Sequence, residues 1–355
     1  MRTIVMCCAL LLSSSALSSC GSRPVADRAA KPRFAIAIHG GAGVIDQLTA
    51  SPEQTQEYLG ALEAALRVGR DELAKGGTAL DACEKVVRVL EDDPKFNAGR
   101  GAVYTADGRH ELDASIMDGK TLKAGAVAGV KTVKNPISLA RLVMQNTRHI
   151  LLAGDGAEEF ATKMNVERVP NSYFDTEYRY KVLQEVLEEQ KKQSMLDDGS
   201  SDVANAASLY QDSYRGTVGC VALDTQGNLA VATSTGGLTA KRWGRIGDSP
   251  IIGAGTYANN KTCAVSGTGS GEQFIRHTVA RDVAALMEYK GMTANQAASE
   301  VVFNRLNKDD GGVIVVSHTG EIALVFSTPG MFRGAADSNG RFEVGIWKDM
   351  NPVQP

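Results

Sequence analysis

The chain has 355 residues, of which 43% are hydrophobic, and its formal net charge at pH 7 is −3. A chain of this size can bury one large core or two modest ones, and neither a basic excess nor a Lys/Arg-rich tract points to nucleic acid. With Gly at 37 and Pro at 10, the composition favours a soluble α/β globule, an enzyme or a binding protein, with many tight turns.

The first 19 residues have the organisation of a secretory signal peptide. Arg2 precedes an apolar run too short to span a bilayer, and small residues follow. The stretch LSSC, which ends at Cys20, resembles the lipidation box of bacterial lipoproteins; the alternative is an ordinary signal peptide with a chance cysteine. Residues 20–33 then fit a tether. These features predict a periplasm-facing lipoprotein of the bacterial cell envelope that contacts the membrane only through its lipid anchor.

The first half of the folded chain alternates strand and helix patterns. Residues 33–43, RFAIAIHGGAG, predict a buried strand that runs into a glycine turn. A capping box with proline at the first helical position opens a helix over 51–76, and a threonine cap opens a second helix over 78–93. Residues 96–119 predict loop, strand, turn and strand, and another helix is expected over 136–148.

Residues 155–216 differ in texture from the rest. Apart from a charged helical pattern near 176–193, they lack a dense apolar period and predict a mobile linker. From Thr217 onward the patterns are a hairpin over 217–235, a glycine-rich region, two helices and two final strands. Helices that flank strand pairs at both ends of the chain indicate two sheets packed between helix layers.

Common catalytic motifs are missing from the sequence, and the glycine-rich loops carry other signals. GxSxG and HExxH do not occur, and GTGSGE at 267–272 lacks the Lys-Ser/Thr of a phosphate-binding loop. In the loop STGGLTAKRWGRIGDSP, Arg245 can pair with a carboxylate and Asp248 can hold an ammonium group, as the backbone of an amino acid requires. The alternative is an ion pair within the loop.

The predicted hairpin opens directly on Thr217, behind Arg215 and Gly216. A threonine hydroxyl needs an adjacent base, and the residue's own α-amine is that base when the threonine is N-terminal. An α-amine has a pKa of about 8, so it is partly neutral near physiological pH and can take the hydroxyl proton. Cleavage after Gly216, by attack of the Thr217 hydroxyl on the Gly216 carbonyl, would create this terminus. Glycine tolerates the strained backbone that the step needs.

Six sequence blocks together resemble one known family. They are HGGAG at 39–43, FNAGRGAVYTADGRHELDASIMDG at 96–119, RGTVGCVALD at 215–224, STGGLTAKRWGRIGDSP at 234–250, GAGTYANN at 253–260 and TGSGE at 268–272. The chain is similar over about 34–335 to the plant-type asparaginases, also called isoaspartyl peptidases, which belong to the N-terminal nucleophile hydrolases. The resemblance implies an α+β fold, a four-layer αββα sandwich.

The resemblance also implies roles for the residues of the reacting centre. Thr217 would be the nucleophile that self-cleavage after Gly216 exposes, and Thr235 would hydrogen-bond and orient it. Thr268 and the N–H of Gly269 would form the oxyanion hole. Thr235 and Thr268 have an alternative role in satisfying turn backbones. His39 is expected to brace the glycine turn, because the mechanism needs no imidazole base.

For the substrate, the resemblance implies that Arg245 and Asp248 grip the α-carboxylate and α-amine, with Gly271 close by and Asn97 near the nucleophile. No cofactor would be required. A structural sodium ion is expected in the segment Leu90–Arg100, named here the sodium loop. Its ligands would be the backbone carbonyls of Leu90, Glu91, Asp93, Phe96, Ala98 and Arg100.

The implied subunits are α, residues 34–216 with the linker at about 155–216, and β, residues 217–355, assembled as a heterotetramer of two α and two β. Many family members carry histidine where this chain has Arg215. Arg215 belongs to the α subunit after cleavage and is not part of the new Thr217 terminus. The difference is therefore expected to affect the rate of self-cleavage.

The implied activity is hydrolysis of the β-amide of L-asparagine and of β-aspartyl (isoaspartyl) dipeptides through a β-aspartyl ester on Thr217. Two alternatives stay open. One is a glycosylasparaginase, although HGGAG and STGGLT favour the asparaginase branch. The other, from a different class, is an uncleaved lipoprotein that binds amino acids.

Overall fold

The computed structural model describes residues 33–43, 51–196 and 216–353, which all belong to one compact unit, Lys31–Pro355. The predicted signal peptide, the lipidation site Cys20, most of the tether and Arg215 lie outside these residues. Among the described helices, none is both long and apolar enough to cross a membrane.

Within the described residues the strands form a nine-stranded and a four-stranded sheet. The strands of the larger sheet are β1 Ala35–Gly43, β2 Leu112–Asp118, β3 Ala124–Val130, β4 Leu151–Ala153, β5 Val218–Leu223, β6 Leu229–Thr235, β11 Gly330–Asp337, β12 Phe342–Gly345 and β13 Asn351–Pro352. Their order is β13-β12-β11-β1-β5-β6-β2-β3-β4. The smaller sheet consists of β7 Thr256–Ala258, β8 Cys263–Gly269, β9 Gly311–Ser317 and β10 Ile322–Phe326, in the order β10-β9-β8-β7.

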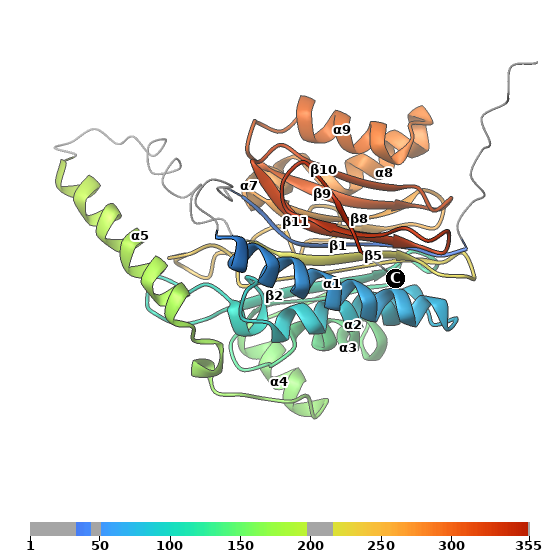
Figure 1. Ribbon diagram of the computed structural model, residues 1–355. Coiled ribbons are helices and arrows are strands. Elements are labelled where there is room, and N and C mark those ends of the chain that lie inside the picture. The colour runs from blue at the N-terminus through green and yellow to red at the C-terminus, as the bar shows by residue number, and fades with distance from the viewer. Residues whose placement is uncertain (1–32, 44–50, 197–215, 354–355) are drawn as a thin grey trace, which may run out of the picture. The chain divides into compact units, whose positions relative to one another are not determined.

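Most of the helices cover the outer faces of the two sheets, and the helix at Glu177–Leu196 extends away from them (Figure 1). They are α1 Pro52–Ala74, α2 Ala79–Asp92, α3 Pro136–Asn146, α4 Gly154–Lys163, α5 Glu177–Leu196, α7 Gly271–His277, α8 Val279–Lys290 and α9 Ala294–Asn304. Figure 1 shows α1, α2 and α3 on one side of the sheets and α8 and α9 on the other. Helices, sheet, sheet and helices thus form the four-layer αββα sandwich that the resemblance implied.

Strand alternation explains why the central strands are apolar on both faces. On β1, Ile36 and Ile38 pack toward α1 and α2, whereas Ala35 and Ala37 pack into the core between the sheets. Successive side chains of a strand point to opposite faces, so a strand between a helix layer and a second sheet needs apolar residues at every position. A third apolar cluster lies between the smaller sheet and the helices α8 and α9.

The predicted helix starts are confirmed. The Ser51 hydroxyl accepts a hydrogen bond from the Gln54 amide (3.1 Å), and the Gln54 side chain accepts one from the Ser51 amide (3.5 Å). The Thr78 side chain caps α2 by accepting from the Asp81 amide (3.1 Å). The helix expected after residue 271 is divided into α7 and α8, because Thr278 adopts a left-handed conformation with φ 46°.

Two predictions from the sequence are wrong in part. Residues 155–196 are not a linker: α4, a 3-10 turn at Asn171–Phe174 and α5 lie there. A few apolar contacts hold α4 and α5 in place: Ala157 and Ala161 are buried on one face of α4, and Leu183 of α5 packs on Tyr104. Residues 197–215 of the predicted linker lie outside the described residues. In 96–119, only one of the two expected strands forms, β2.

Candidate active site

The hairpin β5–β6 brings Thr217 next to Thr235. Val218 at the start of β5 pairs with Ser234 near the end of β6, so the residues just beyond this pair meet at one end of the hairpin. The Thr217 hydroxyl donates to Oγ1 of Thr235 over 3.3 Å. Oγ1 of Thr235 also accepts from the Gly237 amide over 3.0 Å. A hydroxyl oxygen held by a backbone donor is a fixed acceptor, and it fixes the rotamer of Thr217 in turn.

A small cavity opens at this end of the two sheets. It is lined by Ala42, Asn97, Gly216, Thr217, Gly237, Thr268 and Gly269. The structure therefore brings the predicted nucleophile, the predicted oxyanion residues and Asn97 to one place. They come from segments more than 150 residues apart in the chain.

Thr268 and Asn97 are both held by the backbone around the cavity. Thr268 Oγ1 accepts from the Ala42 amide over 3.1 Å. The Asn97 side-chain amide donates to the Gly237 carbonyl over 2.8 Å, and its oxygen accepts from the Val103 amide over 2.9 Å. Both side chains are buried and fixed before any ligand arrives, which is the preorganisation that charge stabilisation in a site requires.

The backbone of the predicted cleavage site touches the glycine turn at the end of β1. Gly216 has φ +29° and Gly41 has φ +117°. A Cβ on Gly216 would lie 2.0 Å from the Cα of Gly41, so no other residue fits this contact without movement. Glycine adopts positive φ readily and other residues rarely do, so both positions favour glycine.

Arg245 and Asp248 converge beside Gly271. A Cβ on Gly271 would lie 2.7 Å from Nη2 of Arg245 and 3.1 Å from Oδ1 of Asp248. These three residues do not line the cavity around Thr217, but Gly269 does, and Gly271 follows it by two residues. The two parts of the predicted site are therefore neighbours.

Arg245 forms an ion pair with Glu272. The ion pair with Asp248 within the loop, which was the alternative from the sequence, is not formed. Nε and Nη2 of Arg245 each donate to a Glu272 carboxylate oxygen over 2.9 Å. Burial alone would raise the pKa of Glu272, but the Arg245 guanidinium lowers it below its ordinary value. Glu272 was not singled out from the sequence; its position directly after Gly271 was the only available signal.

Asp248 is a buried carboxyl with unused bonding capacity. It is 4% exposed, and no group in the described residues hydrogen-bonds its Oδ2. Burial raises its pKa to about 7, against the lowering effect of Arg245. A buried carboxylate oxygen without a hydrogen-bond partner favours a ligand that brings a cation or another donor.

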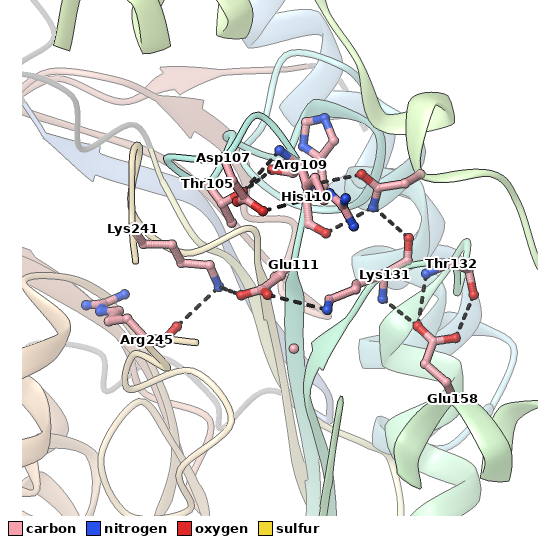
Figure 2. Close-up of polar contacts among 12 residues, drawn as sticks. Thr105, Asp107, Arg109, His110, Glu111, Lys131, Thr132, Glu158, Lys241 and Arg245 are labelled. Carbon is pink, nitrogen blue, oxygen red and sulfur yellow. Dashed lines mark hydrogen bonds and ion pairs between the residues drawn. The ribbon is translucent and has the colours of Figure 1, made fainter. Parts of the chain in front are cut away.

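Lys241 fixes the loop that carries Arg245. Its Nζ donates to the Arg245 carbonyl over 3.2 Å and lies 3.5 Å from Oε2 of Glu111, and its side chain is 1% exposed. Figure 2 shows Glu111 between Lys241 and Lys131, whose Nζ lies 3.8 Å from Oε1. The sequence carried no signal for this contact, because Glu111 and Lys241 are 130 residues apart.

His39 is buried under the nucleophile and does not face the cavity. Its Nδ1 lies 2.9 Å from the Thr217 carbonyl oxygen, and its Nε2 lies 2.8 Å from Oγ of Ser266. Burial lowers the pKa of His39 to about 3, so the ring is neutral at physiological pH. His39 was expected to brace the glycine turn; its side-chain hydrogen bonds instead reach the backbone of the nucleophile and the hydroxyl of Ser266.

Backbone carbonyl oxygens of the sodium loop lie close to its glycines. A Cβ on Gly99 would lie 2.2 Å from the Glu91 oxygen; one on Gly101 would lie 2.1 Å from the Phe96 oxygen and 2.5 Å from the Pro94 oxygen. The carbonyls of Asp93, Phe96 and Ala98 each accept a backbone hydrogen bond. Backbone carbonyls are the donor type that hard cations take, so the chemistry of this segment fits such an ion. No cluster of three or more His, Cys, Asp or Glu side chains suited to a metal occurs among the residues described.

Comparison with known proteins connects this geometry to one family. The family model described as asparaginase matches residues 32–346. The isoaspartyl peptidase of Escherichia coli is 47% identical over 316 residues, which cover 88% of this chain and 96% of that protein. The probable isoaspartyl peptidase/L-asparaginase 2 of Arabidopsis thaliana is 46% identical over 327 residues, covering 89% and 99%. The isoaspartyl peptidase/L-asparaginase of Rattus norvegicus is 42% identical over 335 residues, covering 93% and 94%. The family model covers every residue that lines the cavity and all the described strands and helices except β13, and this chain therefore belongs to the asparaginase family.

Proposed function

We propose that this chain is a self-cleaving threonine hydrolase that releases the β-amide of L-asparagine and the isoaspartyl bond of β-aspartyl dipeptides. The observation that carries the proposal is the contact of the Thr217 hydroxyl with Thr235 at the mouth of the shared cavity, directly after Gly216. The names of the relatives, isoaspartyl peptidase and L-asparaginase, support the substrate class.

Self-cleavage comes first. Oγ1 of Thr217 attacks the Gly216 carbonyl carbon, the Gly216–Thr217 C–N bond breaks, and the Thr217 nitrogen takes the hydroxyl proton. Water then hydrolyses the resulting ester and leaves Gly216 with a carboxylate and Thr217 with a free amine. The close contact of Gly216 with Gly41, which only glycine fits, fixes the position of the Gly216 backbone for this step.

In turnover, the free α-amine of Thr217 takes the hydroxyl proton, and Oγ1 attacks the side-chain carbonyl carbon of the substrate. The negative charge on the substrate oxygen is stabilised by Thr268 and the N–H of Gly269. The proton passes to the leaving nitrogen, and ammonia or the second amino acid departs from a β-aspartyl ester. Water, deprotonated by the same amine, hydrolyses the ester and releases aspartate.

Arg245 and Asp248 account for both substrates with one binding mode. Asparagine and β-aspartyl dipeptides share the same α-carboxylate and α-ammonium, and only the leaving group differs. Arg245 pairs with the carboxylate in place of Glu272, and the Asp248 carboxylate, whose Oδ1 lies beside Gly271, accepts from the ammonium. Gly271 leaves room between them, and Asn97 holds the cavity wall beside Thr217.

The test is to express the full chain and its Thr217→Ala variant in parallel. The wild type should yield a new N-terminus at Thr217 by sequencing and should hydrolyse asparagine and β-aspartyl-leucine; the variant should stay one chain without turnover. Full turnover by an uncut wild type would refute the proposal. Asparagine-linked N-acetylglucosamine as the preferred substrate would indicate a glycosylasparaginase, and amino-acid binding without turnover a receptor.

We further propose that residues 34–216 and 217–355 stay together after the cut as α and β subunits, in a heterotetramer of two α and two β. Light scattering of the cut protein tests the assembly. We also propose a structural sodium ion in the sodium loop, held by backbone carbonyls. No step of the reaction depends on it, and it would stabilise the loop beside Asn97. A melting temperature that rises with Na⁺, measured against a larger organic cation at equal ionic strength, tests it.

The proposed location is the periplasmic face of the bacterial cell envelope, with a lipid anchor on Cys20. The sequence pattern at the N-terminus supports this proposal. Membrane fractionation of the wild type and a Cys20→Ala variant, together with the intact mass of the mature N-terminus, tests it. A water-soluble wild type without added lipid mass would contradict it.

A further inference from the structure

A chain of buried hydroxyl groups leads away from His39 through the interior of the sandwich. Ser266 Oγ contacts His39 Nε2 (2.8 Å) and Thr233 Oγ1 (2.8 Å). Thr256 Oγ1 donates to Thr233 Oγ1 over 2.7 Å. Each of these side chains is fully buried.

The chain ends on the backbone next to Asp248. The Ser115 hydroxyl shares its single proton between Thr256 Oγ1 (2.8 Å) and the Ser249 carbonyl (2.6 Å), because the Thr256 proton is directed at Thr233. Thr256 Oγ1 also lies 3.1 Å from that carbonyl. The Thr217 carbonyl lies at one end of the chain, and the carbonyl of Ser249, the residue after Asp248, lies at the other end.

The members of this chain come alternately from the two sheets. His39, Thr233 and Ser115 belong to the larger sheet, on β1, β6 and β2; Ser266 and Thr256 belong to the smaller sheet, on β8 and β7. The hydrogen bonds therefore join the sheets to each other at every step. A shift of one sheet against the other would break several of them.

The proton order along the chain can be followed from one end. The Thr217 carbonyl can only accept, so Nδ1 of His39 must carry the ring proton, and Nε2 must accept from Ser266. Ser266 then accepts from Thr233, and Thr233 accepts from Thr256. The hydroxyl groups can also turn the other way, because Thr233 can accept from Ser266 and Thr256 can donate to the Ser249 carbonyl. The tautomer of His39 is therefore set by the Thr217 carbonyl, and the hydroxyl chain adjusts to it.

Stability does not explain this chain. Hydroxyl and imidazole groups cost free energy when buried, and their mutual hydrogen bonds only offset that cost. The surrounding inter-sheet core is apolar, with Ala37, Val221 and Val231 among its members. Apolar residues of the same shape would fill the space about as well.

We propose that the chain His39–Ser266–Thr233–Thr256–Ser115 is a positioning network that sets the nucleophile and the amino-acid-binding aspartate at a fixed separation. His39 acts through the Thr217 carbonyl, and Ser115 acts through the Ser249 carbonyl next to Asp248. None of the five touches substrate. The inference rests on the proposed roles of Thr217 and Asp248.

The decisive experiment compares two substitutions of His39. His39→Asn places an amide N–H where Nδ1 was and keeps the bond to the Thr217 carbonyl; His39→Gln places its polar atoms at the ε position and loses that bond. At equal melting temperatures, we expect kcat of the Gln variant to be about tenfold to a hundredfold below that of the Asn variant, because misplacement of a reacting group by about 1 Å has an effect of that size. All rates are divided by the fraction of chain cut at Thr217, measured by intact mass.

The far end of the network has its own test and a matched control. Ser115→Ala should raise KM for asparagine about threefold to tenfold with kcat nearly unchanged, since it loosens the side that holds the ammonium. Ser317→Ala is the control: Ser317 is a buried hydroxyl on β9 that bonds Thr319 (2.9 Å) and pairs with Cys263, at the end of β8 away from Thr268. It should change neither constant.

Equal kcat in the two His39 variants, or a Ser115→Ala variant indistinguishable from Ser317→Ala, would overturn the inference. Should the His39 variants fail to fold, the Ser115 comparison alone decides. Absence of asparagine turnover in the wild type would instead refute the proposed function, so the two failures are distinguishable.

Discussion

His39 offers a prediction whose size follows from its burial. Its pKa falls from 6.5 to about 3 because burial disfavours the charged ring, with the Thr217 hydrogen bond acting in the opposite direction. Between pH 6.5 and about pH 3, His39 is protonated in the unfolded chain but neutral in the folded chain. Stability therefore falls as pH falls through this window, by at most about 1.4 kcal/mol per pH unit.

Integrated from pH 7 to pH 5, the loss attributable to this one residue is about 2 kcal/mol. His39→Asn has no such proton to bind and keeps the donor to the Thr217 carbonyl. The free energy of unfolding of the His39 protein, relative to the Asn variant, should therefore drop by about 2 kcal/mol between the two pH values.

The assay is urea unfolding followed by circular dichroism, at constant ionic strength. Both proteins carry Thr217→Ala, so that each unfolds as a single uncut chain, and the alanine retains the carbonyl that His39 contacts. A difference between the two proteins that is the same at pH 7 and pH 5 would refute the reasoning. It would mean that His39 titrates in the folded state as it does in water.

Arg245→Lys should raise KM for asparagine at least about tenfold, because a lysine cannot form the two parallel hydrogen bonds that a guanidinium gives a carboxylate; an unchanged KM would show that Arg245 does not bind the substrate. Gly216→Ala should slow self-cleavage at least about tenfold in an intact-mass time course, because its Cβ would lie 2.0 Å from the Gly41 Cα at φ +29°. Cleavage at the wild-type rate would show that this contact plays no part. For Asp248, whose pKa burial raises to about 7, neutralisation of the carboxyl below pH 7 should add up to about tenfold per pH unit to the decline in kcat/KM that protonation of the Thr217 α-amine causes. The residual activity of Asp248→Asn should keep only the decline from the α-amine, and a profile as steep as that of the wild type would assign the additional step to another group.

Much of the fold could be read from short-range patterns. The cap at Ser51, the apolar run that forms β1, and the hairpin of β5 and β6 are local signals, and each is confirmed. Residues 155–175 were misread, because α4 is held by only two small buried residues, Ala157 and Ala161, and so few apolar positions give a weak period; the charged helical pattern near 176–193 is confirmed by α5. The break between α7 and α8 was also missed, because nothing local marks Thr278 for a left-handed conformation.

By itself, the sequence determined that Thr217 begins a strand directly after a glycine, and that Arg245 and Asp248 share a loop with the right charges for an amino acid. Only the tertiary structure decided what holds them: Glu272 on Arg245, Lys241 on the loop, and the buried hydroxyl chain from His39. The physical reason is that caps, turns and periodicity act over a few residues, whereas Glu272 is 27 residues from Arg245, Glu111 is 130 residues from Lys241, and the hydroxyl chain joins strands of two different sheets. Which hydroxyl faces which is decided by how the sheets pack, and that packing is a property of the whole core.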